Sequence, residues 1–372
     1  MKQRTILYIS STLDRSSTTR VMYNLVKYLN RASFAPRILT LSPEPALSDY
    51  AHFVELGIPV DSLSLTRIQG LFTLNQAINA YIASHDITLV HTNCLRADSW
   101  LPSRPRTVKA VTTVHSIPDE DYRMSYGGLL GSLLARTHQQ AFGHADAVIA
   151  VSSTVARRLQ ARGIDAVYAC NGVDAALFTP AAQEAKQTLR EQLHLPQDAV
   201  IAISVGHLTP LKDPLTVIKG FTGSRMAAGG QLILLGDGPL YAACSALPAV
   251  RAGKVQLLGV RTNVVDYLQA ADYFISASHS EGMPYSVLEA LACGVPVCLS
   301  DIDSHQEIIE LGGKSGVTFP VGDVGALAAS LDNLLQQEHA ALSEAARQSV
   351  DTHLSARKMA EGYEAIYHQL TE

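Results

Sequence analysis

The sequence SASHSEGMPYSVLEALACGVPV, residues 276–297, carries the chain from a strand into a helix. The apolar run that ends at Ser276 is typical of a buried strand, a loop with glycine and proline follows, and a helical pattern begins near Ser286. Such a junction directs free backbone N–H groups and the positive end of the helix toward a ligand above the sheet. We therefore expect an anion such as a phosphate to bind at this junction.

Two glutamates flank the expected anion site. Glu281 lies in the loop, and Glu289 lies about one turn inside the helix. Because like charges repel, neither is expected to bind phosphate directly, whereas a carboxylate accepts hydrogen bonds from hydroxyl groups. We expect one glutamate to bind the hydroxyls of a sugar and the other to bind those of a ribose.

Short apolar runs separated by helix-length segments continue on both sides of this junction, which is typical of doubly wound α/β domains. The expected strands are residues 5–10, 35–41, 87–91, 108–114, 147–151 and 167–170 in a first series and 200–206, 231–235, 255–258, 273–276 and 295–300 in a second. The composition between the series, rich in alanine, proline and charge, predicts a linker. The expected organisation is an N-terminal Rossmann-like domain (1–175), a linker (176–197), a C-terminal Rossmann-like domain (198–352) and a helix (353–372) that crosses back onto the first domain.

Length and composition narrow the class of protein. A chain of 372 residues with 47% apolar and 17% charged residues suits a two-domain α/β enzyme. A net charge of −5 argues against nucleic acid as the main partner. The short apolar run after Arg4 fits a strand better than a secretory signal, and no run approaches the ~18 apolar residues of a membrane span. Five cysteines without metal-type clustering predict reduced thiols, so we expect a cytoplasmic protein with at most peripheral membrane contact.

The motif around the two glutamates resembles a known family. Residues 278–297 fit the pattern Ser-x-x-Glu-Gly-x-Pro…Leu-Glu-Ala-x-Ala-Cys-Gly-x-Pro-Val, which is similar to the Glu-x7-Glu element of retaining glycosyltransferase family 4, the group 1 glycosyltransferases. This resemblance implies the GT-B fold, in which two Rossmann-like domains face a central cleft. It also implies a nucleotide-sugar donor, retention at the anomeric carbon and no metal or other cofactor.

The resemblance assigns donor residues motif by motif. Glu281 would contact the donor sugar, Glu289 the ribose, and Lys212 with a neighbouring cation the diphosphate. Glycines in the loops after two strands would let the backbone approach the ligand. The implied donor-binding residues are Ser17, Gly206, His207, Lys212, Gly236, Gly238, Val260, Arg261, Glu281, Gly282, Met283, Pro284, Tyr285, Ser286 and Glu289. The implied catalytic residues are His115, Glu281, Lys212 and His207.

On the acceptor side, His115 ends an expected strand, at the edge where open α/β sheets bind ligands. His91, Asn93 and Tyr122 are further acceptor-side candidates, although His91 is equally well explained as a structural residue. The leucines at 129, 130, 133 and 134 share a helical face beside basic residues. That face could meet a lipid-linked acceptor at a membrane surface, but we favour the alternative that it packs on the first domain.

The sequence departs from the family pattern at two places. His207 stands where arginine is usual, so a titratable ring replaces a permanent charge. A bound diphosphate would favour the protonated ring, and a neutral histidine that gives one hydrogen bond is the alternative. Ser16 and Ser17 stand where a glycine pair is usual, and side chains there prevent the closest approach of a donor.

The resemblance implies a hexosyltransferase-type enzyme that uses a UDP- or GDP-sugar and a hydroxyl of a glycan or lipid-linked acceptor, in bacterial surface polysaccharide biosynthesis. The alternatives are a sugar-nucleotide epimerase of similar build and a non-catalytic nucleotide-sugar-binding subunit. Asp301 and Asp303 look like a metal-binding Asp-x-Asp, but they follow a strand of the second series, where the resemblance implies no metal. No Gly-x-Gly-x-x-Gly follows the first strand, which disfavours a nicotinamide-dependent dehydrogenase. The sugar, the base and the acceptor are not specified by these motifs.

Overall fold

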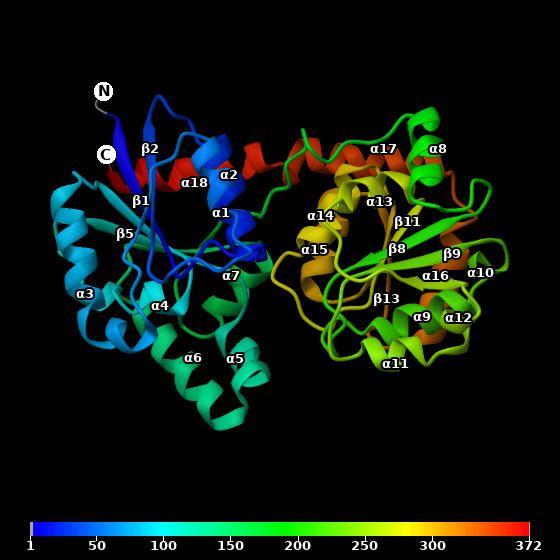
Figure 1. Ribbon diagram of the computed structural model, residues 1–372, viewed down its shortest axis with the longest axis horizontal. Coiled ribbons are helices and arrows are strands. Elements are labelled where there is room, and N and C mark those ends of the chain that lie inside the picture. The colour runs from blue at the N-terminus through cyan, green and yellow to red at the C-terminus, as the bar shows by residue number, and fades with distance from the viewer. Residues whose placement is uncertain (1–2, 372) are drawn as a thin grey trace. The chain divides into compact units, whose positions relative to one another are not determined.

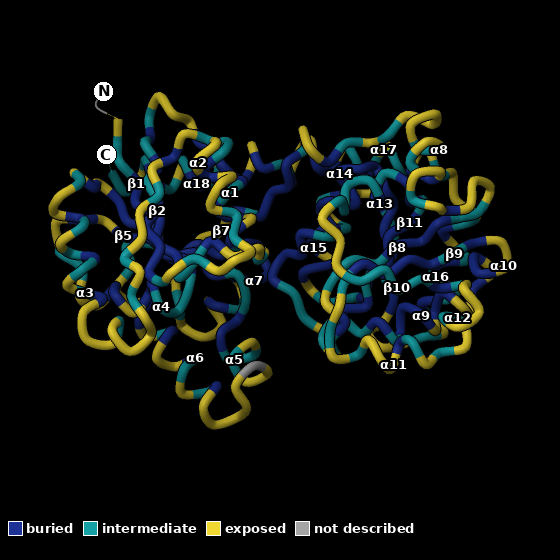
Figure 2. Tube along the Cα trace, in the orientation of Figure 1, coloured by how far each residue is buried: buried dark blue, intermediate teal, exposed yellow. Residues whose placement is uncertain are grey.

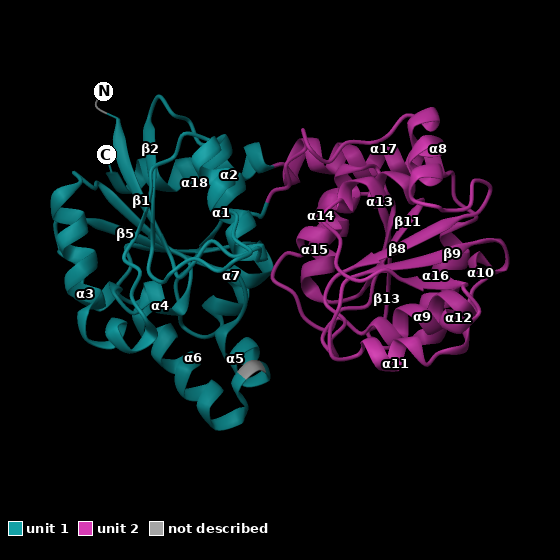
Figure 3. Ribbon diagram, viewed as in Figure 1, with its two compact units in different colours: residues 1–171, 356–372 teal, residues 172–355 magenta. Residues whose placement is uncertain are grey.

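The computed structural model describes residues 3–371 and divides into two compact units (Figure 3). Unit 1 comprises Met1–Asn171 together with Ala356–Glu372, and unit 2 comprises Gly172–Ser355. Met1, Lys2 and Glu372, at the outer bounds of the expected domains, lie outside the described residues. Within residues 3–371, no helix combines the length and apolar character needed to cross a membrane.

Unit 1 contains a parallel sheet in the order β3-β2-β1-β4-β5-β6-β7 (Figure 1). The central strands β1, β4, β5 and β6 are short apolar runs with little exposed surface, so helices must cover both faces of the sheet there. The order reverses direction between β1 and β4, and ligands bind outside the carboxyl ends of strands at such a switch point. The strand bounds are β1 Arg4–Ser10, β2 Phe34–Thr40, β3 Val60–Ser62, β4 Leu89–Thr92, β5 Lys109–Val114, β6 Ala147–Ala150 and β7 Val167–Tyr168.

Unit 2 repeats this topology with the parallel order β10-β9-β8-β11-β12-β13, so its switch point lies between β8 and β11. The two Rossmann-like sheets confirm the expected fold class. The edge strands β3 and β13 were not expected, because their half-exposed sequences lack the apolar runs of the central strands. The strand bounds are β8 Ile201–Val205, β9 Gln231–Leu235, β10 Val255–Leu257, β11 Tyr273–Ser276, β12 Val297–Ser300 and β13 Gly316–Phe319.

The helices lie between the strands as expected. In unit 1 they are α1 Ser17–Tyr28, α2 Tyr50–Glu55, α3 Arg67–Ser84, α4 Leu95–Asp98, α5 Pro118–Tyr126, α6 Gly128–Phe142, α7 Ser153–Gln160 and α18 Ala356–Thr371, with the 3-10 turn Leu101–Ser103. In unit 2 they are α8 Gln183–Gln192, α9 Pro214–Gly223, α10 Met226–Gly229, α11 Tyr241–Ser245, α12 Pro248–Arg251, α13 Val264–Ala270, α14 Tyr285–Ala292, α15 Asp303–Gly312, α16 Val324–Leu334 and α17 His339–Ser349, with the π-turn Val350–Leu354.

The C-terminal helix α18 belongs to unit 1 and buries one of its faces. Figure 1 shows it in red beside the blue N-terminal elements. Tyr363 and Tyr367 are fully buried on its inner face, and the Tyr367 hydroxyl lies 2.6 Å from Nδ1 of His91 at the end of β4. The last helix of the chain therefore helps to build the interior beneath the carboxyl ends of the first sheet.

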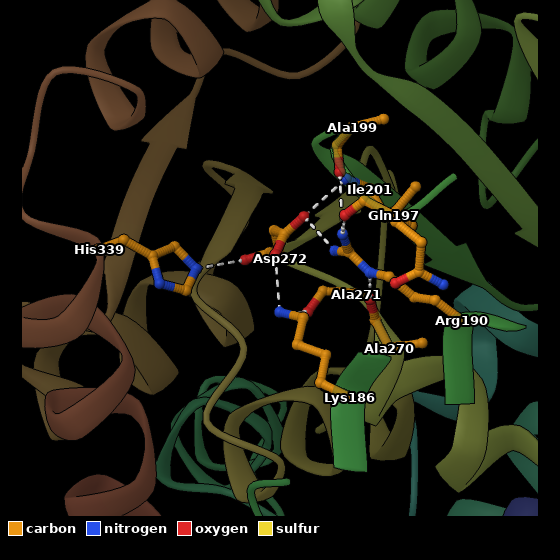
Figure 4. A network of polar contacts seen from close by, with 9 residues as sticks. All are labelled: Lys186, Arg190, Gln197, Ala199, Ile201, Ala270, Ala271, Asp272 and His339. Atoms are coloured by element: carbon orange, nitrogen blue, oxygen red, sulfur yellow. Dashed lines mark hydrogen bonds and ion pairs between the residues drawn. The ribbon is translucent and has the colours of Figure 1, made fainter. Parts of the chain in front are cut away.

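The segment 176–197, expected to be a linker, contributes helix α8 to unit 2. Arg190 and Lys186 of α8 bind the carboxylate of Asp272 at 2.7 and 2.6 Å, and the backbone N–H of Ile201 donates to the same carboxylate at 2.7 Å (Figure 4). His339 of α17 contacts the Asp272 carbonyl at 3.0 Å. Asp272 thus fastens α8 and α17 to the start of β8 and β11. The network uses charged residues, which is why the segment resembled a solvated linker.

Helices α5 and α6 form a hairpin on unit 1, and its leucines differ from the expectation. Leu129, Leu130 and Leu133 were expected to pack on the domain, but they are 94%, 53% and 63% exposed. Figure 2 shows the turn between the two helices coloured as exposed. The hairpin buries a different face, which carries Gly131 and Ala135. Helical spacing cannot decide which of two faces of a helix meets the protein.

Candidate active site

The loops that follow β8 and β11 bring a lysine and a glutamate together at the switch point of unit 2. Lys212 Nζ and Glu281 Oε1 form an ion pair, with 29% and 13% of the two side chains exposed. His279 connects the same loops, because its backbone N–H donates to the Leu211 carbonyl at 2.8 Å and its ring contacts Asp213 at 3.2 Å. The structure therefore places two of the expected donor residues in direct contact.

Two glycines near this pair, Gly236 and Gly238, allow two loops of the protein to pack closely together. A Cβ atom on Gly236 would lie 1.9 Å from the Gly206 carbonyl oxygen, and one on Gly238 would lie 2.6 Å from the Leu208 carbonyl oxygen. The 206–208 and 236–238 loops are joined by the Leu208 N–H, which donates to the Asp237 carbonyl at 3.0 Å. The close approach that these glycines permit is between two protein loops, and it fixes the position of the first loop.

Helix α14 begins at Tyr285 with no side-chain cap, as the strand-to-helix junction predicts. Met283 and Tyr285 are buried, and the Tyr285 hydroxyl donates to the Gly172 carbonyl at 3.1 Å. Contacts from residues 282–285 to a ligand would thus come mainly from the backbone. Glu289 is 3% exposed, and its charge adds to burial in raising the pKa of Cys293 to about 12. Ser286 is half-buried at the start of the helix.

His305 belongs to this site and was not expected. It lies in the first turn of α15, and its Nδ1 contacts the Ser300 carbonyl oxygen at 2.9 Å. Its Nε2 is buried without a hydrogen-bond partner among the described residues. Burial lowers the pKa of His305 to about 4. The charge of Glu281 raises this pKa and the charge of Lys212 lowers it, so His305 lies close enough to feel both residues. The sequence places a histidine five residues after Ser300, but its burial could not be predicted from the sequence, and for this reason His305 was missed.

The remaining donor-side candidates lie on exposed loops of unit 2. His207 follows Gly206 at the end of β8 and is exposed. Val260 is 69% exposed beyond β10, and Arg261 beside it donates only to the Val260 carbonyl, at 3.3 Å, among the hydrogen bonds of the described residues. The His207 and Arg261 side chains are exposed to solvent, whereas Lys212 already has Glu281 as a partner.

A separate small cavity lies at the switch point of unit 1, between α1, the strand ends and α18. His115 lines it, and the pKa of His115 is lowered to about 4 by burial, against the opposing charge of Asp98. Nε2 of His115 and Oδ1 of Asn93 are both buried and lack a hydrogen-bond partner within the part of the chain that is described. The cavity is lined by Tyr8, Thr18, Val21, Met22, Leu25, His91, Asn93, Thr113, His115 and Tyr363.

Three other candidate residues of unit 1, His91, Tyr122 and Ser17, differ from His115 and Asn93 in their surroundings. His91 lines the cavity, but its Nε2 contacts the Thr113 hydroxyl at 2.7 Å and its Nδ1 contacts Tyr367, which favours the structural role. Tyr122 lies away from the cavity lining, and its hydroxyl contacts Nδ1 of His138 at 2.7 Å. Ser17 is exposed at the first position of α1, where Ser16 is the cap and accepts a hydrogen bond from Thr19 N–H at 3.3 Å.

Asp301 and Asp303, which resemble a metal-binding motif, have structural positions in unit 2. Asp301 accepts a hydrogen bond from the Val321 N–H at 2.9 Å, and Asp303 begins α15. Over residues 3–371, no three His, Cys, Asp or Glu side chains gather as metal ligands.

The two sheets with their switch points define the GT-B class of proteins, and comparison with solved structures agrees. The crystal structure of Anabaena HepE in complex with UDP superposes with a TM-score of 0.81 at 18% sequence identity, covering 99% of this chain and 100% of HepE. At this identity the similarity establishes the fold alone.

Sequence comparison identifies the family. The profile for glycosyl transferases group 1 matches residues 185–349, and that for glycosyltransferase family 4 matches residues 18–177. The chain therefore belongs to the group 1 glycosyltransferases of family 4.

Curated relatives match only part of the chain. The N-acetyl-alpha-D-glucosaminyl L-malate synthase of Bacillus anthracis is 29% identical over 188 residues, 49% of each chain. The N,N'-diacetylbacillosaminyl-diphospho-undecaprenol alpha-1,3-N-acetylgalactosaminyltransferase of Campylobacter jejuni is 31% identical over 121 residues, 32% of each chain. The matched segments thus span about half, or less, of the length of these relatives.

Proposed function

We propose that the protein is a retaining, metal-independent glycosyltransferase that transfers a hexose-type sugar from a UDP- or GDP-sugar. The acceptor is a hydroxyl of a glycan or lipid-linked molecule, on the cytoplasmic side of the membrane, in bacterial surface polysaccharide synthesis. The observation that carries the proposal is the Lys212–Glu281 pair at the switch point of unit 2, beside the uncapped start of α14. Membership of the family and the lipid-linked substrate named for the Campylobacter relative support it.

The pair is suited to an activated sugar because it combines a cation and a hydroxyl acceptor. A diphosphate competes with Glu281 for the Lys212 ammonium, and a charge-assisted hydrogen bond to a phosphate oxygen is short and strong. Glu281 is then free to accept hydrogen bonds from the sugar hydroxyls. Arg261 adds an exposed cation, His207 adds an exposed ring that can donate a hydrogen bond, and Glu289 accepts hydrogen bonds from the ribose hydroxyls. Lys212, His207 and the start of α14 near Ser286 then stabilise the negative charge that develops on the leaving diphosphate.

His115 acts on the transferred group as a neutral imidazole. Because burial lowers its pKa to about 4, it carries no charge near neutral pH. Its Nε2, which has no hydrogen-bond partner among residues 3–371, offers a hydrogen bond to a hydroxyl of the sugar or the acceptor. Asn93 Oδ1 is the second open acceptor in that cavity.

Calorimetric titration with UDP and GDP tests the donor site. Lys212→Met should weaken binding of the preferred nucleotide by about tenfold or more, because a hydrogen bond to a charged group contributes about 1.5–3 kcal/mol. Lys219→Met is the matched control, since Lys219 is exposed on α9 away from the pair. Unchanged affinity in the Lys212 variant, or an equal loss in the control, would remove the basis for the proposal.

Product analysis with the preferred sugar nucleotide tests the reaction. We expect transfer to an acceptor hydroxyl with the anomeric configuration of the donor retained, as read from proton–proton couplings by NMR. Transfer should persist in excess chelator if no metal takes part. Conversion of the donor to an epimer without acceptor would identify an epimerase instead. Binding without turnover across a panel of acceptors would identify a non-catalytic subunit.

A further inference from the structure

Several large apolar side chains are exposed together at the turn between α5 and α6. Leu129, Leu130 and Leu133 are 94%, 53% and 63% exposed, and Met124 and Tyr126 on the other side of the turn are 59% and 55% exposed. Large apolar side chains scattered singly on a surface are ordinary, but a cluster marks an interaction site. We call these five residues the hairpin tip.

Contacts between α5 and α6 and with the rest of unit 1 hold the hairpin in place, and its tip is exposed in this arrangement. A Cβ atom on Gly131 would lie 2.3 Å from the Tyr122 carbonyl oxygen, which shows how closely α5 and α6 pack. Below the tip, the Tyr122 ring stacks on the His138 ring, and His138 Nε2 lies 2.6 Å from a carboxylate oxygen of the buried Asp98. These contacts fasten the hairpin to Asp98 at the end of α4, while the leucines of the tip stay exposed.

The charges beside the tip are basic. Leu129, Leu133 and Arg136 follow one another at helical i, i+4 and i+7 spacing, so the exposed Arg136 lies on the same face as the leucines. Arg123 is exposed on α5, where it donates to the Ser132 hydroxyl at 2.9 Å.

The acids at the start of α5 do not cancel these cations fully. Asp119 and Glu120 are paired with Arg162 and Arg158 of unit 1. Asp121 is the exposed acid of α5, and its carboxylate accepts from the Ser116 hydroxyl at 3.2 Å, away from the turn. An apolar face with arginine at its edge is the composition that inserts between the headgroups of an anionic bilayer, where arginine binds phosphates and leucine reaches the acyl chains.

We propose that the α5–α6 hairpin docks unit 1 onto an anionic membrane surface, with Leu129 and Leu133 inserted among the acyl chains and Arg136 at the lipid phosphates. The inference extends the proposed function, since a lipid-linked acceptor is presented at such a surface. The biological role given to the membrane contact rests on the proposed function, whereas the contact itself does not depend on it.

Vesicle co-sedimentation of the full chain tests the contact. The wild type should bind vesicles of phosphatidylcholine with phosphatidylglycerol and bind vesicles of phosphatidylcholine alone more weakly. The double variant Leu129→Gln/Leu133→Gln should lose about tenfold or more in the partition coefficient, because two exposed leucines lose their burial in the bilayer. Arg136→Gln should lose about fivefold on the anionic vesicles only.

The matched control is Leu47→Gln/Leu177→Gln, which replaces two leucines that are 68% and 57% exposed outside the hairpin. Its binding to vesicles should equal that of the wild type. All variants change exposed side chains, and their thermal midpoints should match the wild type. Calorimetric binding of UDP or GDP should also be unchanged in each variant, so that failure of the membrane contact is distinguished from failure of the donor site.

Three results would overturn the proposal. The first is a wild type that does not bind anionic vesicles, and the second is a hairpin variant that binds them as the wild type does. The third is a concentration-dependent dimer in the absence of vesicles that the hairpin variant abolishes, because the tip would then be a contact between two copies of the chain.

Discussion

Asp272 is the residue whose replacement should destabilise unit 2 most clearly. In Asp272→Asn the side chain keeps its shape but loses its charge, while Lys186, Arg190 and the Ile201 N–H still converge on it. The amide has one oxygen, so at least one donor faces an NH2 group. Arg190 is 7% exposed at its side chain and would be left as a buried cation without its counter-charge.

The expected loss follows from this geometry. Removing one partner of a buried ion pair costs about 3–5 kcal/mol. Arg190 keeps hydrogen bonds to the carbonyls of Ala270, Gln197 and Ala199, so we expect the lower end, about 3 kcal/mol. For a unit of this size that corresponds to a fall in the unfolding midpoint of about 6–12 °C.

Urea denaturation followed by far-UV circular dichroism measures the change. Asp351→Asn is the control, because Asp351 pairs with Arg347 at an exposed i, i+4 position and should contribute about 0.5 kcal/mol or less. Fluorescence of Trp100, the single tryptophan and fully buried in unit 1, reports the other unit in the same experiment. A loss below about 1 kcal/mol, or one no larger than in the control, would refute the reasoning.

The same variant predicts a pH dependence. Burial alone would raise the pKa of Asp272, but Lys186, the Ile201 N–H and Arg190 hold it below its ordinary value of 3.8. A carboxyl group with a lowered pKa in the folded state stabilises the protein above the unfolded pKa, and this stabilisation is lost as pH falls through the folded pKa. The difference in stability between wild type and Asp272→Asn should therefore be constant near neutral pH and shrink below about pH 4.

Four further outcomes are expected. Gly236→Ala places a Cβ atom against the Gly206 carbonyl at φ +142 and should lower both stability, by about 2 kcal/mol, and nucleotide affinity, whereas Gly229→Ala, with open space around it, should change neither. His305→Asn should flatten the loss of stability between pH 6.5 and 4, because a buried histidine whose pKa is lowered to about 4 destabilises the fold as pH falls through that window; an unchanged slope in urea titrations would contradict this. His207→Arg should preserve nucleotide binding, because arginine offers a permanent charge at the same exposed position, and a large loss of affinity in calorimetry would disprove a charge role. His115→Ala should lower kcat by about a hundredfold or more with UDP or GDP affinity unchanged, and a change confined to affinity would move His115 out of the reaction.

The amino-acid sequence by itself determined the two parallel sheets and the position of the proposed donor site. Central strands of a doubly wound sheet are buried on both faces, so each appears as an apolar run, and the motif at 276–297 places Glu281 and Glu289 at a strand-to-helix junction. These features are local, because they depend on residues that are neighbours in the chain. For the same reason the exposed edge strands β3 and β13 left no apolar run to be recognised.

Only the tertiary structure decided which side chains meet across distant segments. Lys212 and Glu281 pair because two strand ends are adjacent in the sheet, and His305 becomes a buried neutral residue because the same sheet edge surrounds it. Both ring nitrogens of His91 are occupied, because Tyr367 of the last helix contacts Nδ1 and Thr113 of the neighbouring strand contacts Nε2. The apolar face of α6 has the same sequence whether it is packed or exposed, and it is the packing of Gly131 against α5 that turns Leu129 toward solvent.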